Sequence, residues 1–244
     1  MLGLAKDESL MINGNILTQL KISVMKRTLF ILAIIAGAMM VSCNPDDDDS
    51  NNNGGNNNNG GNNGNGQHNG HEYVDLGLSV KWATCNVGAT SPEDYGHYFA
   101  WGETRPKAEY TEENSLTYGK QMSDISGNAQ YDAATANWGG DWRMPTEDEL
   151  EELRDYCEFE WTQVNGVYGS KVIGPNGSCI FLPAAGSRYG SSLGDAGSYG
   201  YYWISTPDDD NDNRRAYYLV FSNVLDGVGN YIRSVGRTVR PITE

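Results

Sequence analysis

Basic residues and histidines are scarce in this chain of 244 residues, and each scarcity argues against a class of function. Seventeen lysines and arginines stand against 32 aspartates and glutamates, so the formal net charge is −15 and a phosphate backbone would be repelled. The three histidines, His68, His71 and His97, show no His-Glu-x-x-His spacing, which argues against zinc. We therefore expect neither nucleic acid as a partner nor a zinc centre.

Signatures of catalysis are also missing. The chain has no Ser/His/Asp signature and no glycine-rich motif that would bind a phosphate. It has so many carboxylates that no two of them can be singled out as a glycosidase pair. Asp208, Asp210 and Asp212 alternate as at the start of an EF-hand loop, but Asn213 replaces the required glycine and Leu219 the bidentate glutamate. A loose calcium site and a solvated loop both remain open there. We expect no catalytic residue and no cofactor, so we do not expect an enzyme.

Cysteine is rare, with four residues in the chain. If Cys43 has a separate role, Cys85, Cys157 and Cys179 can form at most one disulfide. Cys157 with Cys179 is a candidate pair, because a helix end and a hairpin arm can meet. Cys157 also lies on an apolar stripe, so it can equally be a buried free thiol.

The most apolar run, residues 29–41, follows the basic pair Lys26 and Arg27 and is too short to span a bilayer comfortably. This pattern predicts a signal peptide at residues 25–42, with translation starting at Met25 and residues 1–24 as a spurious extension. Met40-Val41-Ser42-Cys43 resembles the bacterial lipobox, which implies that Cys43 is acylated and becomes the new N-terminus. A signal peptide cut elsewhere, with Cys43 incidental, is the alternative.

Residues 43–71 have the composition of a tether. Four aspartates at 46–49 stay hydrated, and every residue of 51–66 is asparagine or glycine, which offers no apolar surface to offset the entropy of ordering. We expect this segment to be disordered. The acidic stretch behind Cys43 resembles the export signal of Bacteroidetes lipoproteins, which implies a lipid-anchored protein at the cell surface of the outer membrane; simple solvation of a linker is the alternative.

Residues 72–244 show the patterning of a globular domain with one clear helix. Thr146 and Glu149 form a capping box, and Leu150, Leu153 and Cys157 then fall on one face, which predicts a helix ending near Tyr156 or Cys157. A shorter helix is predicted within 131–138. Residues 102–126 have little periodicity and are expected to form a long loop.

The other signals in this domain are β. Short strands are predicted on both sides of Gly77 within 72–83 and in a hairpin over 172–182 with its turn at 174–177. Further strands are predicted at 201–205, 216–221 and 238–242, with a turn at Asp226-Gly227. Short antiparallel strands, one or two helices and long loops indicate an α+β domain.

Several phrases are more specific than this patterning. They are Asp-Trp-Arg-Met-Pro-Thr at 141–146, Phe-Leu-Pro-Ala-Ala-Gly at 181–186, Gly-Tyr-Tyr-Trp-Ile-Ser-Thr at 200–206 and Gly-Arg-Thr-Val-Arg-Pro-Ile at 236–242. With 73–88 and 98–103 they resemble the Fibrobacter succinogenes major paralogous domain of Bacteroidetes lipoproteins, although Ile204 stands where that family often has serine. The resemblance implies a C-type lectin-like fold.

The same resemblance extends to formylglycine-generating enzymes, but the reactive cysteine pair that they need near the C-terminus is replaced by Ser-Val-Gly-Arg-Thr-Val at 234–239. We expect Trp142 and Trp203 to be core residues. Arg143, Arg237 and Arg240 are expected to satisfy carboxylates or backbone carbonyls around the sheet.

Two long loops, 187–199 and 207–215, are the best candidates for ligand contact. Arg188, Tyr189 and Tyr199 combine flat aromatic faces and a guanidinium with neighbouring serine and glycine, a composition found in paratopes and sugar-binding surfaces, although ordinary turn chemistry would explain it equally well. The sequence therefore predicts a surface-exposed module that binds a glycan or protein ligand. A structural or assembly component of the outer membrane envelope is the alternative.

Overall fold

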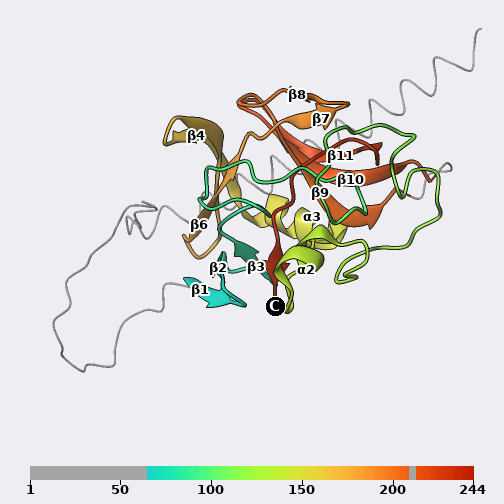
Figure 1. Cartoon of the computed structure of the whole chain (residues 1–244). Helices are drawn as coiled ribbons and strands as arrows, with labels where there is room; N and C mark the ends of the chain where they lie inside the picture. The colour runs from blue at the N-terminus through green and yellow to red at the C-terminus, as the bar shows by residue number, and fades with distance from the viewer. Residues whose placement is uncertain (1–64, 209–212) are drawn as a thin grey trace, which may run out of the picture. The chain divides into compact units, whose positions relative to one another are not determined.

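The computed structural model describes residues 65–208 and 213–244, in which short antiparallel strands far outweigh helices (Figure 1). The strands form three small sheets, ordered β1-β2-β3-β12, β11-β10-β9 and β4-β5-β6, and a separate β7–β8 hairpin. The helices are α2 Ala133–Trp138 and α3 Glu147–Tyr156. The strands are β1 Asn65–His68, β2 His71–Val74, β3 Lys81–Ala83, β4 Glu158–Val164, β5 Val167–Ile173, β6 Cys179–Pro183, β7 Ser187–Tyr189, β8 Ser192–Gly194, β9 Gly200–Pro207, β10 Arg215–Phe221, β11 Asp226–Ile232 and β12 Ile242–Thr243. This architecture confirms the α+β class.

Helix α3 begins and ends as its sequence predicts. The Thr146 hydroxyl accepts a hydrogen bond from the Glu149 N–H, and the Glu149 carboxylate accepts one from the Thr146 N–H at 2.8 Å. Arg143 donates to both Glu149 oxygens, at 2.6 and 2.8 Å. Burial raises the pKa of Glu149, but the hydrogen bonds from Arg143 and Thr146 outweigh it and the pKa is lowered. The apolar face, with Leu150 and Leu153, is buried.

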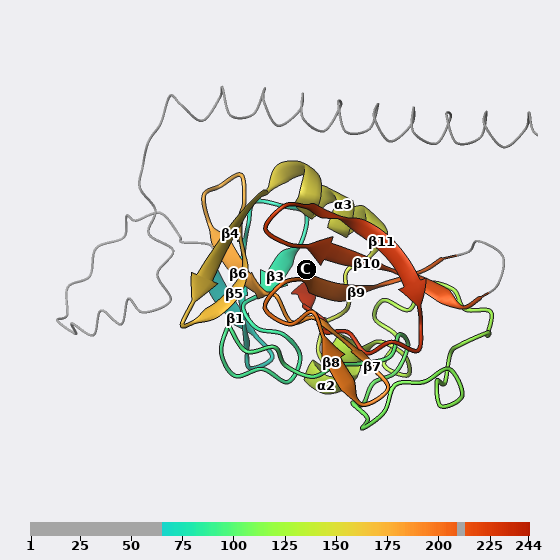
Figure 2. The same ribbon diagram turned by 90° about the horizontal axis from the view of Figure 1, so that it is seen from above.

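The β9–β10–β11 sheet separates two hydrophobic clusters. Successive residues of a strand point to opposite faces, so Tyr202 and Ile204 join the cluster that holds Leu150 and Leu153 of α3, while Trp203 joins the cluster on the other face. Figure 2 shows α3 on one side of this sheet and α2 with the β7–β8 hairpin on the other. The second face is therefore covered by loops and short elements, and the candidate site lies on this side.

Strand β1 and His71 lie inside the range expected for the tether, so this end of it is ordered. The reason is aromatic packing: the His71 ring stacks on Trp138 with centroids 3.8 Å apart, and the Trp142 indole N–H donates to the His68 carbonyl at 2.9 Å. Burial lowers the pKa of His71. The asparagine and glycine run at 51–64 lies outside the described residues.

Most of the predicted short helices and strands are confirmed, and three predictions are wrong in detail. Helix α2, the β5–β6 hairpin and strands β9 and β10 match their predicted positions, and 102–126 contains no helix or strand. Asp226-Gly227 is not a turn, because it opens β11 and the chain reverses at 222–225. Of the predicted closing strand 238–242, only Ile242 belongs to a strand, while Thr238 makes an isolated bridge to Tyr202. The predicted loop 187–199 contains the β7–β8 hairpin.

Candidate functional site

Arg188 and Tyr189, two of the three predicted ligand residues, lie next to each other on β7 but face different surroundings. The Arg188 guanidinium lies 5.0 Å from the centre of the Tyr98 ring, so it takes part in packing within the domain. Tyr189 is 44% exposed and meets Tyr231 edge-on at 6.0 Å. The strand is held by hydrogen bonds between Arg188 and Gly236, which place Tyr189 beside the segment that follows β11.

Tyr189 and Tyr199 are the two ends of a group of tyrosines that we call the tyrosine face: Tyr189, Tyr199, Tyr201, Tyr218 and Tyr231. Tyr199 stacks on Tyr201 at 5.7 Å with an interplanar angle of 5°, and Tyr201 meets Tyr218 edge-on at 5.9 Å. Tyr218 and Tyr231 lie on the neighbouring strands β10 and β11, and every member of the group is at least partly exposed. Of its five residues, sequence reasoning found only Tyr189 and Tyr199.

The position of Tyr218 depends on two local features of the sheet. The register between β10 and β9 shifts between Ala216 and Tyr218, a bulge that re-aims the tyrosine side chain. Opposite it on β11 is Gly229, where a Cβ would lie only 2.7 Å from the Tyr218 ring and hydroxyl. Glycine therefore lets the Tyr218 ring lie flat across β11.

Arg237 lies under the tyrosine face and is only 2% exposed. The distances from its guanidinium carbon to the ring centres are 3.4 Å for Tyr218, 4.5 Å for Trp203, 5.0 Å for Tyr201 and 5.3 Å for Tyr231. Its Nε and Nη1 atoms are buried without a hydrogen-bond partner. Burial lowers the pKa of Arg237, with the surrounding tyrosines acting in the opposite direction.

The expectation that Arg237 would satisfy a carboxylate or carbonyl is wrong, whereas for Arg143 and Arg240 it is confirmed. Arg143 pairs with Glu149 and with Glu244 at 3.0 Å. The Arg240 guanidinium donates to the carbonyls of Ala83, Thr84 and Phe181 and to the side chain of Asn86. Arg237 instead relies on the faces of aromatic rings.

The composition of residues 187–243 offers a signal that sequence reasoning could have used. This segment contains six arginines and no lysine or glutamate, together with seven of the fifteen tyrosines of the chain. Binding surfaces are enriched in tyrosine and arginine and depleted in lysine and glutamate. The six aspartates of the segment balance its arginines, so the acidic excess of the chain lies elsewhere.

The structure gives no support to a metal or to the predicted disulfide. Asp208 is buried, while Asp210 and Asp212 of the candidate calcium loop lie outside the described residues, and residues 65–208 and 213–244 hold no cluster of three metal-ligating side chains. Cys85 and Cys157 are free thiols, so of the two alternatives for Cys157 the buried free thiol is confirmed and the pair with Cys179 is not formed. Cys179 therefore pairs with neither of them. Burial raises the pKa of the Cys157 thiol to about 12, so this thiol is inert at neutral pH.

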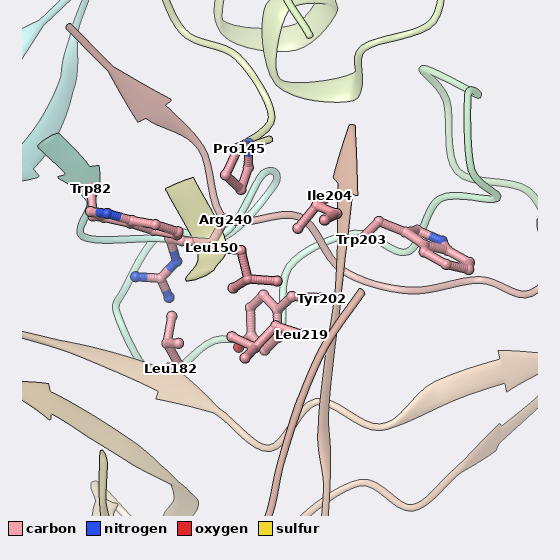
Figure 3. A pocket seen from close by; sticks show the side chains of 9 residues that line it. All are labelled: Trp82, Pro145, Leu150, Leu182, Tyr202, Trp203, Ile204, Leu219 and Arg240. Atoms are coloured by element: carbon pink, nitrogen blue, oxygen red, sulfur yellow. The ribbon is translucent and has the colours of Figure 1, made fainter. Parts of the chain in front are cut away.

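Figure 3 shows the side chains that line a cavity, among them Leu150 of α3 and Tyr202 of the β9–β10–β11 sheet. It is lined by core side chains such as Trp82, Leu150 and Leu219, together with Arg240, and its volume is about 10 Å³. That is about the space of one water molecule, so the cavity cannot hold a sugar or a cofactor.

Comparisons of the chain with models of known protein families, with curated proteins and with solved structures find no match. Neither helix of the described part has the length and apolar character needed to cross a bilayer.

Proposed function

We propose that this chain is a non-catalytic binding module that is held at the outer face of the outer membrane by a lipid on Cys43 and that binds a glycan or protein ligand through the tyrosine face. The motif resemblance at 141–146, 181–186, 200–206 and 236–242 supports a C-type lectin-like domain of the major paralogous lipoprotein type. The observation that carries the binding function is the set of partly exposed tyrosines, whose two groups of ring contacts meet at the Arg237 guanidinium.

The geometry of these rings favours binding for a physical reason. A tyrosine side chain offers a large flat apolar surface and a polar end, and it loses little conformational entropy when it binds. Here Tyr199 and Tyr201 already fix each other by stacking, and Tyr201 and Tyr218 are fixed by the buried guanidinium beneath them. The surface is therefore organised before a ligand arrives, which reduces the free-energy cost of binding.

The binding function can be tested with the double substitution Tyr189→Ala and Tyr199→Ala. We expect an affinity loss of about tenfold or more in glycan-array and pull-down experiments, because buried aromatic contacts dominate binding energies. Tyr156→Ala is a matched control, since Tyr156 is 55% exposed on α3 and lies outside the tyrosine face. Both proteins should melt at nearly the wild-type temperature.

Unchanged binding by the double variant would reject the tyrosine face as the binding surface. Stable co-purification with envelope proteins, unaffected by the double substitution and without any hit on the array, would instead favour a structural or assembly role.

The lipid anchor is tested by Cys43→Ala. We expect complete loss of incorporated fatty acid and release of the protein from the membrane fraction, because the lipid on Cys43 is the proposed attachment and neither described helix could cross a bilayer. Cys85→Ala is the control and should remain in the membrane. Mass spectrometry of the N-terminal peptide shows which group the Cys43 sulphur carries. One sulphur cannot hold both a thioether lipid and a disulfide. A disulfide-linked peptide pair of Cys43 and Cys179 would therefore overturn the proposal.

A further inference from the structure

We propose that Arg237 is an anion-binding centre within the tyrosine face and that the ligand of this face is an acidic glycan, whose carboxylate pairs with the Arg237 guanidinium while its sugar rings lie against the tyrosines. This inference rests on the proposed binding function and names the class of ligand.

The first argument is the comparison of Arg237 with two other buried arginines of the same C-terminal segment. Arg233 donates to the backbone carbonyls of Arg215, Thr117 and Lys120. Arg240 donates to three carbonyls and one side-chain oxygen. Arg237 is as buried as both, yet two of its nitrogens have no acceptor. Of these three arginines, only Arg237 has buried nitrogens without a hydrogen-bond partner.

The second argument is the charge. A buried cation is unfavourable unless it is paired and hydrogen-bonded, and no carboxylate among the described residues lies within ion-pair distance of Arg237. The surrounding rings offset part of this cost, because their faces attract the cation. They also hold the planar guanidinium in one orientation, and apart from a side-chain hydrogen bond with Tyr218 its Nε and Nη1 atoms are left without an oxygen partner. A carboxylate is the group whose geometry and charge complete this site.

Because Arg237 is only 2% exposed, a carboxylate reaches it only if a neighbouring side chain moves, and we assign this movement to Tyr189. This ring is the most exposed member of the tyrosine face, and it belongs to a hairpin of three residue pairs whose second strand consists of exposed residues. Rotating the Tyr189 side chain away from Tyr231 breaks the edge-on ring contact and the side-chain hydrogen bond between the two tyrosines. The four rings that surround the guanidinium lie on the three-stranded sheet.

The balanced charge of the C-terminal segment makes an anionic ligand acceptable to a chain that is otherwise strongly negative. Residues 187–243 carry equal numbers of arginines and aspartates, whereas the formal net charge of the whole chain is −15. An anion that approached another part of the domain would meet net repulsion. The flat rings favour a sugar over an acidic peptide, because each ring can cover one face of a pyranose.

The test is isothermal titration of the full lipidated chain in detergent with tri-galacturonate and with its carboxyl-reduced counterpart, tri-galactose. The two probes differ only in that each carboxylate of the first is a primary alcohol in the second. We expect the wild type to bind tri-galacturonate about tenfold or more tightly than tri-galactose, because charge-assisted hydrogen bonds are roughly twice as strong as neutral ones. Arg237→Gln should reduce this ratio to about one, since glutamine keeps a planar polar group but loses the charge.

Arg215→Gln is the matched control. Arg215 is an exposed arginine at the start of β10 that donates to Asn230, so its replacement removes the same charge from the same sheet without touching Arg237. The control should keep the preference for the acidic probe. A structural defect in Arg237→Gln would weaken the binding of both probes equally. The proposal instead requires a change in the ratio of the two affinities.

The wild-type ratio is decisive even if Arg237→Gln does not fold. Equal affinities of the wild type for the two probes would overturn the proposal that the ligand is acidic, and would leave the proposed binding function intact. Binding of an acidic peptide with no response to either oligosaccharide would also overturn it. No binding partner in arrays or pull-downs would remove the proposed function itself.

Discussion

Replacing Arg240 with methionine is expected to lower the free energy of unfolding by about 3–5 kcal/mol, because it leaves several buried acceptors without a donor. The Arg240 guanidinium donates to Asn86 Oδ1 at 2.8 Å, to the carbonyls of Ala83 and Thr84 at 2.9 and 2.7 Å, and to the Phe181 carbonyl at 3.0 Å. These acceptors belong to β3, the segment after it, and β6. One side chain thus holds two sheets and the C-terminal segment together, and urea denaturation with a two-state fit would measure the loss.

Two further variants separate this role from a general effect of losing positive charge. Arg215→Met removes an exposed arginine and should change stability by less than about 0.5 kcal/mol. Arg240→Lys keeps the charge but cannot reproduce the planar fork, so it should recover only part of the loss. A loss below about 1 kcal/mol for Arg240→Met would contradict the role assigned to this side chain.

The elements that the sequence predicted well are those with local causes. The start of α3 is set by Thr146 and Glu149, which are three residues apart, and the β5–β6 hairpin is set by turn residues at 174–177. The β4–β5 hairpin was not predicted, although Asn165-Gly166 is a strong turn signal and both residues have positive φ. Its strand β4 carries charged residues on an edge, which hides the alternation of apolar residues.

The elements that were predicted wrongly depend on distant partners. Thr238 forms an isolated bridge to Tyr202 and residues 239–240 belong to no strand, so no continuous ladder forms there. Asp226-Gly227 fits a turn by its composition, yet pairing of Asp226 with Phe221 in the β10 ladder makes it the start of β11. Strand β1 depends on the packing of His71 on Trp138, a contact across more than sixty residues that no local pattern reveals.

The same distinction explains the candidate site. Tyr189 and Tyr199 were found because loops rich in serine, glycine and tyrosine are recognisable by composition. Arg237 was expected to behave like Arg240, three residues away, because nothing in the local sequence distinguishes them. Their difference arises from the tertiary neighbours: backbone carbonyls of 83, 84 and 181 for Arg240, and aromatic rings from β9, β10 and β11 for Arg237.

Asp132, on the other side of the β9–β10–β11 sheet, resembles Arg240 in one respect. It is a buried charged side chain that makes hydrogen bonds to several separate segments. It is fully buried and caps helix α2. Its Oδ1 accepts the N–H groups of Ala134 and Thr135 at 2.8 and 3.0 Å, and its Oδ2 accepts those of Gly127 and Met144 at 2.9 and 2.8 Å. One carboxylate therefore joins the end of the long loop, the start of α2 and the segment before α3.

Asp132→Ala should lower the free energy of unfolding by about 3–4 kcal/mol, because it removes a helix cap and leaves two further N–H groups, those of Gly127 and Met144, without an acceptor. Asp132→Asn should also lower the free energy of unfolding by a large part of this amount, since its amide NH₂ would face two N–H donors. Urea denaturation measures the total, and hydrogen exchange at Ala134 and Thr135 should accelerate before global unfolding. The exposed Asp141→Ala is the control, and equal stability of Asp132→Ala and this control would show that the loop, α2 and α3 are joined by packing alone.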